Sequence, residues 1–275
     1  MKQALFSIIW FTWMSLHMAM AQNTCVNVPH IKTLQVIANG NWMAPPIIHL
    51  NTTDKVEISF DELTHEYHRY TYKIIHCNAD WTPSDLFDTD YLQGFNDNVI
   101  ENYENSLNTT MLYTHYSFQL PNGEAQLLIS GNYQVNIYGE DDEETPVAQA
   151  CFSVIEPRVG VSAEVSSNTD IDTNESHQQV SFTVNYPGMN VTSPQSEFNV
   201  RVYQNQRTDN CVSDLQPTYL QPGQMQFVHN RKLIFPAGNE YRRFEVFNMH
   251  YGYQDVEQMQ FFNPYYHATL FPDQP

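Results

Sequence analysis

The segment IIHCNADWTPSDL, residues 74–86, places several chemically capable side chains within a few positions of one another. A cysteine beside a histidine can form an activated thiolate nucleophile, and the same two side chains can bind zinc. Adjacent residues of a β-strand point to opposite faces, however, so His76 and Cys77 cannot readily hydrogen-bond to each other. We therefore predict a structural role for the segment, with Ile75 and Cys77 on one face and Trp81 as a bulky core or rim residue.

The polar residues that follow this strand are typical of turns rather than of a catalytic site. Asn78 is part of the same structural segment. Asp80 and Asp85 are expected to cap turns by accepting hydrogen bonds from backbone N–H groups. No Ser-His-Asp order, paired-carboxylate pattern, phosphate-binding loop or dinucleotide-binding fingerprint emerges elsewhere in the sequence. We predict that the protein is not an enzyme and that it uses no cofactor.

The cysteines bear on redox chemistry and on metal binding. The chain has four, Cys25, Cys77, Cys151 and Cys211. Disulfides form in exported proteins, but four cysteines allow three full pairings, and the sequence does not choose among them. Their wide spacing, with no C-x-x-C, does not match a zinc site. Because Cys211 alone lies in the second half of the chain, we expect at most one disulfide, with free buried thiols as the alternative.

Two further groups of side chains could bind a metal ion. The acidic run Glu140–Glu144 offers the oxygen ligands that Ca²⁺ prefers, but it lacks the glycine and the spaced terminal glutamate of an EF-hand loop. We interpret this run as a solvated hairpin tip. His65 and His68 are three residues apart in a segment that enters a strand, which is a weak zinc signal. No metal site is predicted.

Aromatic residues make up 13% of the chain, and some of them could contact a ligand. Exposed aromatic rings on an exported β-sandwich, with Trp42 and Trp81 as candidates, could stack against sugar rings. Core packing is the simpler explanation, because aromatic side chains dominate burial energetics. A glycan-binding module nevertheless stays the alternative to the function considered below.

Residues 1–21, MKQALFSIIWFTWMSLHMAMA, have the pattern of a secretory signal peptide. Lys2 supplies a short positive region, an apolar stretch follows, and Ala19-Met20-Ala21 places small side chains where signal peptidase needs them. We predict cleavage between Ala21 and Gln22. The apolar run is short for a bilayer span of ~20 residues and lacks a basic stop-transfer flank, so a membrane anchor is not expected. The residues before Cys25 do not form the apolar motif of a lipoprotein.

The formal net charge is −19, and removal of the leader would take away Lys2 and no acidic residue. Nucleic-acid binding depends on Lys and Arg that neutralise phosphates, so a nucleic acid is not an expected partner. The same charge disfavours adhesion to anionic lipid, and no direct insertion into lipid is expected. It favours solubility or a basic partner.

Alternation of apolar and polar residues, rather than helical periodicity, recurs along the chain after residue 21. Each alternating stretch predicts a strand with one buried and one exposed face, and turn residues such as Pro121-Asn122-Gly123 separate the stretches. Residues 85–104 form one long irregular stretch, whose aromatic residues predict a packed loop. The apolar members of the predicted strands are Val56, Ile58 and Phe60; Tyr116, Phe118 and Leu120; Tyr133, Val135 and Ile137; Val180, Phe182 and Val184; Phe198, Val200 and Val202; and Phe244 and Val246.

Many short alternating strands separated by turns predict an all-β protein of two tandem Ig-like antiparallel β-sandwich domains. The boundary is expected near Pro157, because one strand ends at Ile155 and another begins at Val159. A first domain would then occupy residues 22–157 and a second domain residues 158–275. The second has fewer predicted strands than the ~7 of a complete sandwich, so we expect it to be truncated.

Segments along nearly the whole expected mature chain, from about Ile31 to Asp273, match one family pattern in order. They are IKTLQV at Ile31, PPIIHLN at Pro45, ISFDEL at Ile58, YTYKIIHCNADWTPSDL at Tyr70, YLQGFNDN at Tyr91, YTHYSFQLPN at Tyr113, LLISGNYQVNIY at Leu127, FSVIEPRV at Phe152, and, further on, HQQVSFTVNYPG, VRVYQNQRTDNCVSDLQP and FPAGNEYRRFEVFNMHYG. Their order is specific, although no single segment is diagnostic. Together they resemble the plug protein of the type IX secretion system of Bacteroidota.

The resemblance implies a location and a partner. Proteins of this family are periplasmic and are not enzymes, and they seal the lumen of an outer-membrane β-barrel translocon from its periplasmic side. The expected location is therefore the periplasm, at the inner face of the outer membrane. Family members are also longer than this chain, which agrees with the expected truncation of the second domain.

Overall fold

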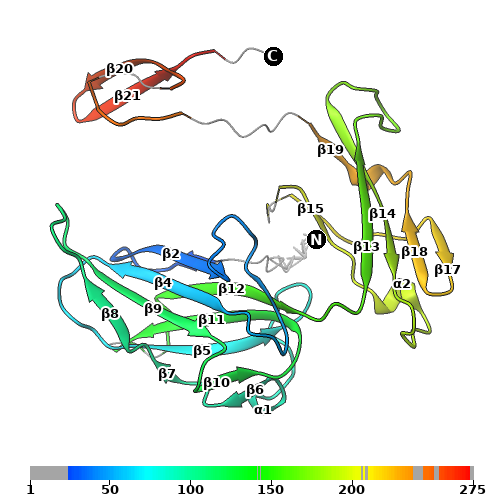
Figure 1. Ribbon diagram of the computed structural model, residues 1–275, viewed down its shortest axis with the longest axis horizontal. Helices are drawn as coiled ribbons and strands as arrows, with labels where there is room; N and C mark the ends of the chain where they lie inside the picture. Colours follow the sequence, from blue (N-terminus) through cyan, green and yellow to red (C-terminus); the bar gives the residue numbers. More distant parts are fainter. Residues whose placement is uncertain are drawn as a thin grey trace, which may run out of the picture. The chain divides into compact units, whose positions relative to one another are not determined.

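The computed structural model is built almost entirely of β-strands (Figure 1). The leader and its expected cleavage site between Ala21 and Gln22 lie outside the described residues. The structure describes residues 24–140, 142, 144–205, 207, 210–237, 244–250 and 254–272. The predicted fold class, all-β with antiparallel sheets, is confirmed. No helix among the described residues has both the length and the apolar composition needed to cross a lipid bilayer.

The N-terminal part of the chain folds as two sheets, which we call the first sandwich (β1–β12, residues 25–155). One sheet has the strand order β1-β12-β11-β5-β7, and β3 pairs in parallel with β12. Its strands are β1 (Cys25–Val26), β12 (Ala148–Ile155), β11 (Gly131–Gly139), β5 (Tyr70–Cys77), β7 (Asn98–Val99) and β3 (Ile47–His49).

The second sheet of the first sandwich has the order β2-β4-β9-β8 and is antiparallel throughout. Its strands are β2 (Ile31–Ala38), β4 (Val56–Glu62), β9 (Thr114–Leu120) and β8 (Asn102–Asn105). β6 (Leu92–Gly94) pairs with β10 (Ala125–Leu127) in a separate two-stranded ribbon. β6 begins directly after the short helix α1 (Asp88–Tyr91).

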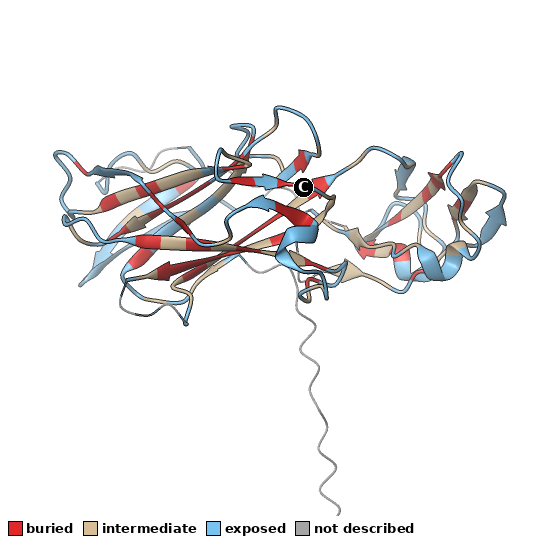
Figure 2. Ribbon diagram, turned by 90° about the horizontal axis from the view of Figure 1, so that it is seen from below, coloured by how far each residue is buried: buried red, intermediate tan, exposed pale blue. Residues whose placement is uncertain are grey.

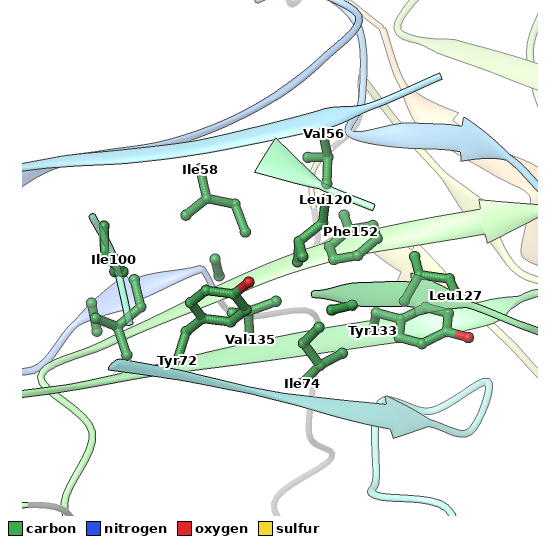
Figure 3. Close-up of a cluster of buried hydrophobic side chains, with 14 of the residues drawn as sticks. Val56, Ile58, Tyr72, Ile74, Ile100, Leu120, Leu127, Tyr133, Val135 and Phe152 are labelled. Atoms are coloured by element: carbon green, nitrogen blue, oxygen red, sulfur yellow. The ribbon is translucent and has the colours of Figure 1, made fainter. Parts of the chain in front are cut away.

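Side chains from both sheets form one continuous hydrophobic core. In Figure 3, Val56 and Ile58 of β4 face Tyr72 and Ile74 of β5 across the interior. Aromatic rings extend this core. Phe60 stacks on Tyr116 with ring centroids 5.3 Å apart, and offset-stacked rings add to the energy of simple burial.

The alternation in the sequence explains how each strand is oriented. Along β5 the pattern alternates between buried and partly buried positions as far as Ile75, and Figure 2 shows such alternation along the strands of the first sandwich. A one-residue shift in pairing would turn the buried side chains of a strand toward water. The register of β5 against β11, from Tyr70 opposite Gly139 to Cys77 opposite Asn132, is therefore fixed by burial.

The strands after Ile155 form smaller sheets. A five-stranded sheet has the order β13-β14-β18-β17, with β19 also paired to β14, and two hairpins are separate from it. The elements are β13 (Gly160–Ser166), β14 (His177–Asn185), α2 (Pro194–Glu197), β15 (Val202–Tyr203), β16 (Cys211–Val212), β17 (Tyr219–Gln221), β18 (Gln224–Phe227), the 3₁₀ turn η1 (Arg231–Leu233), β19 (Ile234–Pro236), β20 (Val256–Phe262) and β21 (Tyr265–Leu270).

Contacts along the backbone divide the chain into two compact units. One comprises the residues up to Ser162 together with Phe182–Phe227, and the other comprises Ala163–Ser181 together with the chain from Val228 onward. The division passes through both β13 and β14. The predicted domain boundary near Pro157 lies two residues beyond the end of β12.

Most of the predicted strands are present, and two need correction. The stretches at Val56, Tyr116, Tyr133 and Val180 lie in β4, β9, β11 and β14. Of the strand predicted over Phe198–Val202, only Val202 is in a strand, because the pairing with β16 covers two residues. The strand predicted at Phe244 and Val246 is absent from the described residues 244–246, which are irregular.

The stretch over residues 85–104, which was predicted to be a long irregular loop, instead contains α1, β6, β7 and most of β8, and it is only partly packed. Tyr91 and Leu92 are buried, as predicted. Phe87 and Phe95 are instead 78% and 74% exposed, and Tyr103 is 44% exposed. The prediction of a fully packed loop was therefore wrong for these three rings.

Candidate functional site

His76 and Cys77 lie on opposite faces of β5. The His76 ring contacts Tyr91 and Tyr133 on the core side, with centroid distances of 5.8 and 5.2 Å. Cys77 faces the other way, into a small cluster with Trp81 and Cys151. The imidazole therefore cannot act as the base for this thiol.

His76 is held in place by its surroundings. Its Nδ1 lies 2.9 Å from the Ser84 hydroxyl oxygen, and burial lowers the pKa of the ring below its ordinary value. The backbone of Gly131 passes so close that a Cβ atom there would overlap the His76 ring. These contacts give His76 a packing role between β5 and β11.

Cys77 is unsuited to nucleophilic chemistry at neutral pH. Burial, with a smaller contribution from Cys151, raises the pKa of its thiol to about 11, and the thiolate is the reactive species. All four cysteines, Cys25, Cys77, Cys151 and Cys211, are free in the structure. Cys77 and Cys151 lie on strands that both pair with β11. Two strand spacings separate their backbones by roughly 10 Å, which is beyond disulfide reach.

The residues after Cys77 form a tight turn that positions Trp81. Asp80 Oδ1 accepts hydrogen bonds from the Thr82 backbone N–H at 3.1 Å and from the Thr82 hydroxyl at 2.6 Å. These bonds lower the pKa of Asp80. The Asn78 N–H donates to the Thr82 carbonyl, and the Trp81 N–H donates to the Asn78 carbonyl. Asp80 thus caps the turn, as predicted.

Trp81 adopts a positive φ of 68°, which is costly for a bulky residue. The turn holds this conformation, and the indole is only 5% exposed above Cys77 and Cys151. Burial of the ring offsets the backbone strain. Asp85 behaves differently: it is exposed, and its side chain accepts no hydrogen bond within the described chain, so the predicted cap there was wrong.

The segments considered for metal binding are dispersed. His68 Nδ1 lies 2.8 Å from Glu62, whereas His65 Nε2 lies 3.1 Å from the Ser106 carbonyl. The acidic run connects β11 to β12, and Asp142 accepts hydrogen bonds from the backbone N–H groups of Glu144 and Thr145. Among the residues that the structure describes, no three His, Cys, Asp or Glu side chains gather as a metal site.

A groove with a volume of about 820 Å³ lies on the first sandwich, where β7 ends one sheet and β8 ends the other. Its lining comes from β5, the segment 95–99, β8, β9 and the turn at Asn122. Tyr72 and Phe118, which are both in the lining, stack against each other with ring centroids 4.3 Å apart. Phe95, also in the lining, is 74% exposed.

Asparagine side chains organise the groove walls. Asn96 accepts a hydrogen bond from the Ile74 N–H at 2.6 Å and donates to the Ile74 carbonyl at 2.8 Å, which ties the loop to β5. Asn122 donates to the Tyr72 hydroxyl oxygen at 2.9 Å. Asn98, which is 8% exposed, donates to the Phe95 carbonyl at 2.7 Å. The lining is therefore fixed by bonds within the sandwich.

The groove is acidic. Its lining contains four carboxylates, those of Asp88, Asp97, Glu101 and Glu124, and no Lys, Arg or His. Asp88 accepts hydrogen bonds from the Tyr91 hydroxyl and the Asn96 amide, and Asp97 lies 3.9 Å from Lys73 Nζ. Glu101 and Glu124 are exposed, and their carboxylates have no partner among the described residues. Two negative charges are thus available to a ligand.

Sequence reasoning did not identify this groove. Its residues come from segments between Tyr72 and Glu124 that only the fold brings together. One signal was present: Asn, Asp and Glu are dense between residues 85 and 105, far denser than a packed loop needs. Polar side chains that can form hydrogen bonds on surface connections are typical of a binding surface.

Residues 31–156 match the family model described as Type 9 secretion system plug protein 1st domain. A search of curated proteins found no match.

One solved structure is similar over most of the chain. It is the crystal structure of a hypothetical protein from Parabacteroides merdae ATCC 43184, with a TM-score of 0.82 and 47% sequence identity. The match covers 90% of this chain and 62% of the solved one, so the chain spans less than two thirds of the length of that relative. Residues 31–156, which contain nearly all of the first sandwich and its groove, are thus similar to the first domain of type 9 secretion system plug proteins.

Proposed function

We propose that the protein is a non-catalytic plug that binds the outer-membrane translocon barrel of the type IX secretion system and seals it from the periplasmic side. The family match over residues 31–156 carries this proposal. Membership in a secretion-system family points to the cell envelope, and the signal-like leader agrees with export.

The first sandwich supplies what a plug needs mechanically. Sealing requires a rigid body, and the single core shared by two sheets resists deformation because protein interiors are close-packed. The segment from His76 to Trp81, which contains the most reactive side-chain types, serves packing and a turn. These contacts support a role by shape rather than by chemistry.

A net charge of −19 supports a polar, reversible interface. Stable obligate contacts are larger and more apolar, whereas charged contacts contribute specificity and association rate. Binding to basic surfaces of the translocon is therefore expected to weaken as ionic strength rises.

Affinity purification from an outer-membrane extract tests the proposal. The full chain, tagged at its C-terminus, is expected to recover a very large β-barrel protein, identified by mass spectrometry, and to release it at high salt. Recovery of polysaccharide without any barrel protein would instead favour a glycan-binding module. Binding that is unchanged between low and high salt would remove the electrostatic part of the proposal alone.

A further inference from the structure

We propose that the acidic groove is the surface by which the first sandwich grips its partner, and that it takes an extended segment bearing Lys or Arg. This inference rests on the proposed function, because it names the surface and the chemistry of that interaction. The groove is the space of about 820 Å³ lined by Tyr72, Phe118 and the segment 95–99.

Charge selects the class of ligand. Two of the four lining carboxylates already have partners, Asp88 in hydrogen bonds and Asp97 beside Lys73. Glu101 and Glu124 have no side-chain partner among the described residues, and no cationic side chain lines the groove to balance them. A cationic segment would supply that balance, whereas an anionic one would be repelled.

Aromatic rings in the lining suit the aliphatic stems of Lys and Arg side chains. Phe95, which is 74% exposed, and Phe118, which is partly buried against the buried Tyr72, offer apolar surface in the same lining as the carboxylates. Lys and Arg carry long aliphatic stems that pack on apolar surfaces while their charged ends reach polar groups. Arg also stacks on aromatic rings. The combination of carboxylates and aromatic rings in one lining therefore favours Lys or Arg over a small cation.

The neighbouring backbone suits an extended segment. β7 and β8 are the last strands of their respective sheets, and Val99 and Asn102 of these strands line the groove. All four residues of β8 are exposed. An edge strand presents unpaired N–H and C=O groups, and a partner segment can add to it as a further strand. Backbone pairing and charge contacts can thus act together on one segment.

A neutral glycan is the competing occupant, because amide-rich grooves with an exposed ring also bind sugars. The four carboxylates with no balancing cation distinguish the two, since a neutral sugar gains nothing from them. The expected signature of the basic segment is a strong dependence on salt. Binding of a neutral sugar would be almost independent of salt.

The test uses the full chain with the substitutions Glu101→Gln and Glu124→Gln together, and a matched control with Glu66→Gln and Glu144→Gln. All four glutamates are exposed, and the control residues do not line the groove. Both double variants remove two negative charges. Both are expected to unfold at the same urea concentration as wild type, because exposed, unpaired carboxylates contribute little to stability.

Binding to the detergent-solubilised translocon barrel gives the first readout. The groove variant is expected to bind roughly threefold to tenfold more weakly than wild type at low salt, since it loses two exposed charge pairs with the partner, each of which contributes modestly. The control variant is expected to bind as wild type does. Equal binding by all three proteins would overturn the groove inference and leave the proposed function standing.

A peptide probe gives a readout that does not depend on the barrel. A fluorescent peptide with alternating Arg and Val is expected to bind wild type and to bind the groove variant more weakly, while its Glu-for-Arg counterpart binds neither. Groove-dependent peptide binding without barrel binding would support the groove and contradict the plug function. Groove-dependent binding of a cello-oligosaccharide, with no peptide binding, would overturn the basic segment as the occupant.

Discussion

The first sandwich and the C-terminal hairpin β20–β21 carry similar aromatic side chains but bury them very differently. Phe60, Tyr116 and Phe152 of the first sandwich are fully shielded from solvent. In the hairpin, Phe261 and Tyr265 are 55% and 71% exposed, and every residue of β21 is exposed. Both places thus contain strands with aromatic residues, but a strand contributes to a core only where a second sheet covers it.

This difference indicates that most of the free energy of unfolding comes from the first sandwich. Burying a large apolar side chain contributes ~1.5–3 kcal/mol, and the first sandwich does so repeatedly along β4, β5, β11 and β12. The hairpin buries only Val256 among its strand residues. We therefore expect the first sandwich to unfold as a unit, and substitutions in the hairpin to leave that transition unchanged.

The largest expected effect is that of Phe60→Ala. This substitution removes a ring that packs against both Tyr70 and Tyr116 and leaves a cavity. The expected loss in the free energy of unfolding is ~3–5 kcal/mol, measured by urea denaturation of the full chain. A loss below ~1 kcal/mol would show that the shared core is not the main source of stability.

Trp81→Ala tests whether the face of β5 and β12 that points away from the core also contributes to stability. The indole covers Cys77 and Cys151, so its removal is expected to cost ~2–4 kcal/mol and to expose both thiols. The measurement is the rate of modification by a chromogenic thiol reagent in native buffer. Cys77 and Cys151 are expected to react slowly in wild type and much faster in the variant, with Cys77→Ser and Cys151→Ser used to assign each thiol.

The dependence of the urea midpoint on pH also tests the first sandwich, because His76 lies in it. Burial lowers its pKa in the folded state, so the unfolded state binds more protons below pH ~6.5. Stability is therefore present above that pH and is lost as the pH falls toward the folded-state pKa. His76→Asn is expected to flatten the fall in urea midpoint over this window. An unchanged slope in the variant would assign the acid sensitivity to other groups.

The smallest expected effect is that of Phe261→Ser combined with Tyr265→Ser in the hairpin. Both rings are mostly exposed, and surface substitutions usually change stability by less than ~0.5 kcal/mol. The urea midpoint of the first sandwich is expected to match wild type. A loss comparable to that of Phe60→Ala would mean that the hairpin carries a core of its own.

The sequence predicted the strands whose one face is buried and missed the places where pairing is short. Val56, Ile58 and Phe60 alternate because they enter a core, and β4 follows that pattern. The same alternation from Phe198 to Val202 predicted a strand of which only the end exists, since β16 offers two residues to pair with. Local pattern records which side chains could be buried, whereas the partner strand decides whether a sheet forms.

The candidate site was harder to predict than the fold. The turn at Asp80 could be predicted from local sequence, because an aspartate side chain can accept a hydrogen bond from the backbone N–H of the residue two positions later, here Thr82. The groove could not, since its lining joins Tyr72 of β5, the segment from Phe95 to Asn102 and the turn at Asn122, which only the fold brings together. The number of negative charges that the groove offers to a ligand depends on which carboxylates already have partners. Only the three-dimensional structure shows those partners.

The most direct test of the account is the ion conductance of the translocon barrel in a planar bilayer, with the full chain added on the periplasmic side. The account predicts that the conductance falls when the protein is added at low salt and returns when it is washed away at high salt. The groove variant with Glu101→Gln and Glu124→Gln is expected to close the barrel only at higher protein concentration. An open conductance that persists while the protein is demonstrably bound would contradict obstruction by shape.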